Sequence, residues 1–288
     1  MSGFFDPIVR TIRGVDAVGA TSRLTAAARA RESARADRLF EDRWAAELAG
    51  EEGFSLLEGN DASLHGQAPP AFVVRHRFFD DFLTRQTSRG IRQVVLIAAG
   101  LDTRAFRLSW PAGVHLFELD QPAVLTYKEE VLGNARAAAR CHRHLVPADL
   151  RGDWPSALTD TGYRRTERVA WLAEGLLFYL PETTVTALLD ATAALSIAGS
   201  TLGTDTMSAA TLGHQSRQAW VSYYASVGAP FIFATDHPGE LLGRHGWRPA
   251  LHPYSDVARQ LGRSWPSPVL PGPKNTLITA TRALIGQT

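Results

Sequence analysis

The chain has 288 residues, 45% hydrophobic and 20% charged, so it can bury the core of one large α/β domain or of two small ones. Its formal net charge of +1 gives no field that would indicate binding to nucleic acid or to a membrane surface. The single cysteine, Cys141, excludes an internal disulfide and a multi-cysteine zinc site. No apolar run reaches the ~20 residues of a membrane span, and "MSGFFDPIVR" lacks a signal-peptide core. These features favour a cytoplasmic protein.

The first 90 residues are expected to form a helical cap. Residues 21–49 are rich in helix formers, with apolar positions at helical spacing. Residues 50–68 are polar and glycine-rich, which indicates a flexible crossing. Residues 69–90 open with two prolines and close with a glycine, the usual punctuation of a helix.

From residue 91 to 288 the pattern predicts an α/β core. Apolar runs of strand length alternate with helical segments, which implies a parallel sheet covered on both faces by helices. Residues 207–247 break this rhythm with many aromatic side chains and are expected to form an inserted helical lobe. The remaining residues predict a strand, a helix and a closing strand. The five expected strands before the lobe lie in 91–100, 113–120, 141–150, 168–180 and 199–207.

Carboxylates occur where successive strands end. The first strand ends at Gly100, and the next three end at Asp120, Asp149 and Glu174. Ligands of open α/β sheets bind at these carboxyl ends. Asp102 and Asp120 could instead be helix caps, and Asp149 a turn residue. Acids at three successive strand ends nevertheless indicate a ligand site.

The turn "IAAGLDTR" has one glycine where a nicotinamide-binding turn would need others, at Ala98 and Thr103. The pattern therefore disfavours a nicotinamide-dependent oxidoreductase. It favours a nucleoside without a diphosphate, with its ribose hydroxyls bound by Asp120, about 20 residues after Gly100.

Five segments in this order resemble the leucine carboxyl methyltransferase-like family of S-adenosylmethionine-dependent enzymes, with the actinobacterial and tetracenomycin-type polyketide carboxyl methyltransferases the most similar. They are "VVRHRFFDDFL", "AAGLDTRAFRL", "FELDQPAVLTYK", "VPADLRGDWPSAL" and "WLAEGLLFYLPE". The resemblance spans residues 20–207. It implies a doubly wound Rossmann-like methyltransferase sheet of seven, mostly parallel strands. S-adenosyl-L-methionine is the implied cofactor.

The resemblance also assigns residues to the cofactor. It implies that Arg75 pairs with the carboxylate of the methionine part, for which a planar guanidinium is suited. The basic residue that some relatives carry near the N-terminus could be Arg29 or Arg31. Ala98 stands where relatives often have glycine. The implied cofactor-binding residues are Arg75, Gly100, Asp102, Asp120 (ribose), Asp149 and Leu150 (adenine) and Glu174 (amino group).

The acceptor is expected to be a carboxylate of a small, polyketide-like secondary metabolite. A carboxylate is already anionic at pH 7, whereas a phenol would profit from a general base. The sequence shows no His–Asp dyad at a strand end and no metal-binding cluster. Methylation of a phenol and a non-catalytic S-adenosylmethionine sensor remain alternatives. No nucleic-acid or membrane partner is expected, and either a monomer or a homodimer is compatible with the sequence.

Tyr179 follows the fourth strand and is predicted, with Arg104, to be catalytic. Arg104 could neutralise an anionic acceptor or pair with a nearby acid. Aromatic residues at helical spacing can also belong to the core rather than to a binding site. The predicted acceptor-binding residues are Trp220, Tyr223, Tyr224 and His214.

Overall fold

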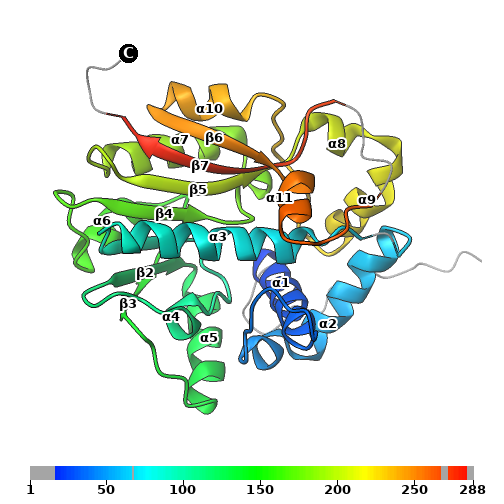
Figure 1. Ribbon diagram of the computed structural model, residues 1–288, viewed down its shortest axis with the longest axis horizontal. Helices are drawn as coiled ribbons and strands as arrows, with labels where there is room; N and C mark the ends of the chain where they lie inside the picture. Colours follow the sequence, from blue (N-terminus) through cyan, green and yellow to red (C-terminus); the bar gives the residue numbers. More distant parts are fainter. Residues whose placement is uncertain (1–16, 67, 267–271, 284–288) are drawn as a thin grey trace, which may run out of the picture.

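The computed structural model describes residues 17–66, 68–266 and 272–283 (Figure 1). Its centre is a seven-stranded sheet in the order β3-β2-β1-β4-β5-β7-β6. Strands β1 to β5 run parallel, and β7 pairs antiparallel with both β5 and β6. The predicted mostly parallel sheet is confirmed. The strands are β1 Gln93–Ile97, β2 His115–Asp120, β3 His142–Pro147, β4 Val169–Ala173, β5 Thr201–Thr206, β6 Trp247–Pro253 and β7 Thr276–Arg282.

The two faces of the sheet bury separate cores because side chains alternate along a strand. In β1, Val94 and Leu96 join the core that contains residues of α1, α2, α3 and α11. Val95 and Ile97 join the core of α6, α7 and α10. All five residues of β1 are buried, which explains why the strand is an unbroken apolar run at its centre.

The helices lie along both faces of the sheet and gather at one end of it (Figure 1). They are α1 Ala17–Ser33, α2 Ala45–Ser63, α3 Ala71–Ser88, α4 Arg104–Arg107, α5 Pro122–Asn134, α6 Trp154–Asp160, η1 Leu177–Tyr179, α7 Glu182–Ala194, α8 Ala209–Gly213, η2 Gln215–Arg217, α9 Gln218–Ser226, α10 Pro238–Arg244 and α11 Tyr254–Gln260.

The expected flexible crossing at 50–68 is wrong, because α2 occupies most of it. Its glycines mark close approaches of the chain. A Cβ on Gly53 would lie 2.5 Å from the carbonyl oxygen of Arg23 in α1, and one on Gly59 would lie 2.6 Å from the ring of Tyr223. The helical pattern predicted over residues 21–49 is interrupted, since α1 ends at Ser33 and α2 begins at Ala45. Helix α3 packs against β4 and β5, so the predicted cap also supplies a layer of the core.

The lobe after β5 is shorter than predicted. Helices α8 and α9 and the turn η2 form it (Figure 1). Helix α10 packs against β6, and Trp247 is the first residue of that strand and is buried. The last part of the range 207–247 therefore belongs to the sheet layer. Trp247 is an aromatic residue of the core and not of the lobe.

Candidate active site

A cavity lies at the carboxyl ends of the parallel strands. Its walls come from the turn after β1, from the ends of β2, β4 and β5, and from α1, α3, α9 and α11. Strands β1 and β4 are neighbours in the centre of the sheet, and the strand order reverses between them. This is the point at which open α/β sheets bind ligands.

The turn after β1 brings backbone close to the cavity. The amide of Gly100 donates a hydrogen bond of 2.5 Å to Oδ2 of Asp120, and Oδ1 accepts one of 2.7 Å from the Gln121 amide. Gly100 has a φ of +51°, and a Cβ there would lie 3.1 Å from Cβ of Ser22 in α1. Ala98 has the same left-handed φ of +51°, which is strained for a residue with a side chain. At position 100 a side chain would add a tight contact with α1 to the same backbone strain, which favours glycine there.

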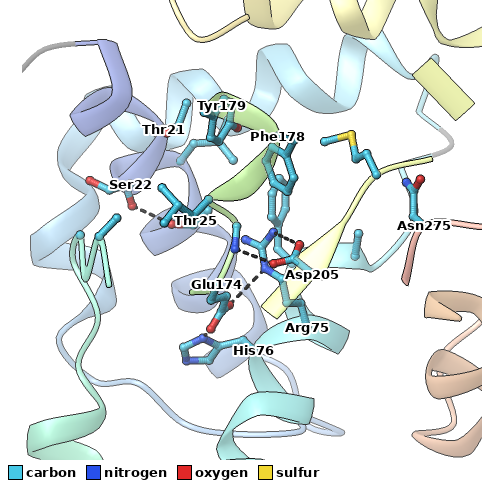
Figure 2. Close-up of a pocket in the computed structure, with 18 of the residues that line it drawn as sticks. Thr21, Ser22, Thr25, Arg75, His76, Glu174, Phe178, Tyr179, Asp205 and Asn275 are labelled. Carbon is cyan, nitrogen blue, oxygen red and sulfur yellow. Dashed lines mark hydrogen bonds and ion pairs between the residues drawn. The ribbon is translucent and has the colours of Figure 1, made fainter. Parts of the chain in front are cut away.

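Arg75 is bound by acids from two strand ends (Figure 2). Its Nε lies 3.2 Å from Oε1 of Glu174, and its Nη1 lies 3.2 Å from Oδ2 of Asp205. Burial opposes the charge of Arg75, but attraction to Asp205 and other neighbours raises its pKa well above the usual value. Asp205 also accepts hydrogen bonds from the amide of Gly175 (2.6 Å) and from the hydroxyl of Tyr254 (2.8 Å).

Asp205 was missed by the sequence reasoning, although a signal was present. It lies in the strand "GSTLGTDTM", at the fifth strand end, where the same rule that selected Asp120 and Glu174 applies. Burial raises the pKa of Asp205, and Arg75 only partly offsets this.

Arg104 does not line the cavity. Its side chain is 0% exposed and pairs with Asp80, with Asp102 and, at 2.8 Å, with Glu174. Burial alone would raise the pKa values of Asp80 and Asp102, but the arginines around them lower both to about 2. Of the two roles considered for Arg104, the structure supports pairing with acids. The pairing of the guanidinium with three carboxylates disfavours the predicted catalytic contact with an acceptor.

His76 belongs to the same network and lines the cavity (Figure 2). Its Nδ1 lies 3.0 Å from Nη2 of Arg104, and its Nε2 lies 2.6 Å from Nη2 of Arg107. Burial, reinforced by these two positive charges, lowers the pKa of His76 well below its usual value. The imidazole is therefore neutral at pH 7 and a weak base.

The residues around Glu174 and Asp205 fit S-adenosylmethionine. Oε2 of Glu174 is buried and lacks a well-directed hydrogen bond, although Arg104 lies 2.8 Å away. An ammonium group could supply the missing donor. Arg29 lines the cavity and binds Asp42 (2.8 Å) and the carbonyl of Leu101 (2.6 Å), whereas Arg31 pairs with Asp61 near the surface. The structure thus brings Arg29, and not Arg31, to the site.

An aromatic cluster closes the other end of the cavity. The ring of Phe231 lies 4.6 Å from both Trp220 and Tyr224, and 5.7 Å from Tyr179, measured between centroids. Asn60 in α2 fixes this wall, because its Oδ1 accepts hydrogen bonds from Trp220 Nε1 (3.2 Å) and the Tyr224 hydroxyl (3.3 Å). Neither Asn60 nor Phe231 was selected from the sequence, since only tertiary contact joins α2 to the lobe.

Five of the predicted site residues do not line the cavity, and three of these, Tyr223, His214 and Asp149, bind elsewhere. The hydroxyl of Tyr223 donates 2.7 Å to the carbonyl of Leu56, and His214 caps η2 through Ser216. Asp149 is partly exposed and pairs with Arg151. The predicted residues that line the cavity are Arg75, Gly100, Asp102, Asp120, Glu174, Tyr179, Trp220 and Tyr224; those that do not are Arg104, Asp149, Leu150, Tyr223 and His214.

Residues 22–193 match the family described as leucine carboxyl methyltransferase. A protein of Frankia alni is 43% identical over 276 residues, which cover 92% of this chain and 94% of that protein. A Streptomyces coelicolor protein is 40% identical over 282 residues, covering 92% and 95%. The chain belongs to the leucine carboxyl methyltransferase family. Both relatives are named as candidate S-adenosyl-L-methionine-dependent methyltransferases, which supports the predicted cofactor.

Solved structures agree with the family's fold. A DUF574 family protein from Streptomyces avermitilis superposes with a TM-score of 0.64 at 14% identity, over 91% of this chain and 97% of that one. A candidate methyltransferase from Thermobifida fusca gives a TM-score of 0.62, also at 14% identity, over 91% and 94%. The expected Rossmann-like methyltransferase sheet is confirmed. Within the described ranges no helix is long and apolar enough to cross a membrane.

Proposed function

We propose that this member of the leucine carboxyl methyltransferase family transfers a methyl group from S-adenosylmethionine to a carboxylate oxygen of a small, polyketide-like molecule. When bound, the cofactor supplies an activated methyl group on a sulfonium. Protein residues then need to bind the two substrates, align the acceptor oxygen with the methyl group and exclude water. This positioning is the main source of the rate of such a transfer.

The observation that carries this proposal is the state of the titratable side chains along the cavity. His76 has a strongly lowered pKa, and both oxygens of Asp205 already accept hydrogen bonds. Burial raises the pKa of Tyr179, so its phenol stays protonated at neutral pH. These groups are poor acceptors for a substrate proton. An acceptor that is already ionised, such as a carboxylate, needs none.

The chain's own residues suit a methionine-derived nucleoside. Arg75 lines the cavity, where it can pair with the carboxylate of the methionine part. Glu174 also lines the cavity, and its Oε2, which lacks a well-directed hydrogen bond, can accept a hydrogen bond from the ammonium group. Asp120, held by the amide of Gly100, is proposed to bind ribose hydroxyls. The adenine contacts assigned to Asp149 and Leu150 stay predictions, because both residues lie outside the cavity wall.

The extent of the cavity favours an enzyme over a sensor. The same cavity runs from the turn at Gly100 to the aromatic wall of Trp220 and Tyr224. A sensor would not need space beside the cofactor, whereas an acceptor with flat rings could stack on this wall. Tyr179 faces this space from η1 and is proposed to position the acceptor there.

Methylation of a phenol is the second candidate, and one observation favours it. Burial raises the pKa of Asp205, which also lines the cavity, so its carboxylate is the strand-end acid best suited to take a proton. Against this, both of its oxygens are occupied by Arg75, Gly175 and Tyr254.

A single assay separates the two. The protein is incubated with S-adenosylmethionine and a set of aromatic acids and phenols, and products that gain one methyl group are detected by mass spectrometry. Each product is then treated with mild alkali. A methyl ester loses its methyl group and supports carboxyl transfer; an alkali-stable ether would show that the acceptor is a phenol. Binding of S-adenosylmethionine without any product would favour the sensor.

A further inference from the structure

Arg217 differs from the other arginines that line the cavity, Arg29 and Arg75. Arg29 pairs with Asp42, and Arg75 pairs with Glu174 and Asp205. Within the described part of the chain, the Arg217 side chain forms no ion pair, and its buried Nε has no hydrogen-bond partner. Burial lowers the pKa of Arg217, and among the described residues no carboxylate opposes that effect.

An arginine keeps its charge at neutral pH, so a half-buried and unpaired guanidinium carries a cost in solvation. The cost is removed when an anion binds. Arginine offers a planar fork of donors that matches a carboxylate with two parallel hydrogen bonds. Arg217 is therefore suited to pair with an anionic ligand that enters the cavity.

The position of Arg217 points to the acceptor and not to the cofactor. Arg217 ends η2 in the lobe, and Trp220 and Tyr224 follow it three and seven residues later. This spacing places side chains on one face of a helix, and all three line the cavity. The described lining residues that are carboxylates, Asp102, Asp120, Glu174 and Asp205, come instead from the turn after β1 and from strand ends.

We propose that Arg217 binds the carboxylate of the acceptor while the aromatic wall receives its rings, so that the substrates are aromatic carboxylic acids. Arg217 is then a specificity-determining residue. This inference rests on the proposed function, since it requires that the acceptor occupies this cavity.

The test compares acids with their uncharged amides. Calorimetry in the presence of S-adenosylhomocysteine measures binding of 2-naphthoate and anthracene-2-carboxylate, each against its carboxamide. The proteins are the wild type, Arg217→Gln, Arg217→Lys and the control Arg244→Gln, whose arginine is on the surface and pairs with Glu240. Wild type should prefer at least one acid by on the order of 10-fold or more, the scale of a hydrogen bond to a charged group.

Arg217→Gln should remove this preference by weakening the acid and not the amide. Arg217→Lys should keep part of it, and Arg244→Gln all of it. A preference that survives in Arg217→Gln, or a wild type that prefers neither acid, overturns the inference. Binding of S-adenosylhomocysteine is measured in the same experiment. If the wild type fails to bind it, the proposed function itself fails; if binding is intact in every variant, a lost or absent preference concerns Arg217 alone.

Discussion

Replacement of Gly175 by alanine tests the central ion-pair network. Gly175 follows Glu174 at the end of β4 and has a φ of +67°. An added Cβ would lie 2.8 Å from Nη2 and 2.9 Å from Cζ of Arg75. These distances are too short for real contacts. The guanidinium would have to move, although Glu174 and Asp205 hold it at 3.2 Å each.

The cost has two parts. A left-handed backbone costs a residue with a side chain about 1–2 kcal/mol. Loss of one buried hydrogen bond to a charged group costs about 1.5–3 kcal/mol. We expect Gly175→Ala to lower the free energy of unfolding by about 2.5–5 kcal/mol, the sum of the two costs. For a chain of this size each kcal/mol shifts Tm by about 2 °C, so Tm should fall by about 5–10 °C.

Gly262→Ala is the matched control. Its φ is +69°, and no atom lies within 4 Å of an added Cβ, so only the backbone cost applies. Its Tm should fall by about 2–4 °C. Thermal unfolding followed by circular dichroism measures both variants. Calorimetric titration should show weaker binding of S-adenosylmethionine to Gly175→Ala and unchanged binding to Gly262→Ala. Equal Tm losses in the two variants would refute the claim that Arg75 is fixed in place.

Three further predictions concern the site. Asp120→Ala should weaken S-adenosylmethionine binding by about 1–3 kcal/mol through loss of a hydrogen bond to a charged group, and unchanged affinity in calorimetry would contradict the ribose role. Asn60→Ala should raise KM for the acceptor while leaving cofactor affinity intact, because it frees Trp220 from α2; a change confined to cofactor binding would be inconsistent with this. Asp80 and Asp102 have pKa values lowered to about 2, so the stability they contribute is complete above the unfolded pKa of about 4 and is lost between pH 4 and pH 2. Tm followed from pH 5 to pH 2 should show this loss, reduced in Asp80→Asn.

Much of the fold was predictable because the strands are long apolar runs in a buried parallel sheet. The four consecutive apolar residues at the centre of β1, Val94–Ile97, are typical of a strand that is buried on both faces of a sheet. Helix α2 was not predictable in this way. The close approaches at Gly53 and Gly59 involve Arg23 and Tyr223, which lie far away in the sequence, so the glycines looked like signs of flexibility.

The site was predictable where a residue's place on its strand decides its place in space. Asp120 and Glu174 lie at the ends of β2 and β4, the two strands that flank β1, and both line the cavity; Asp205 at the end of β5 obeys the same rule. No sequence pattern indicates a role for Asn60, because that role depends on hydrogen bonds to Trp220 and Tyr224, 160 and 164 residues later in the chain.

The strands, the single-glycine turn and the acids at the strand ends can be read from the sequence, because each depends on the order of residues along one segment. Which charges are paired follows from the folded arrangement of the chain. Arg104 looked like a residue for the acceptor, yet three carboxylates surround it, whereas Arg217 carried no signal and lines the cavity without an ion pair. The physical reason is that the energy of a charge depends on distances to groups from remote segments, as between Arg75 and Asp205, 130 residues apart.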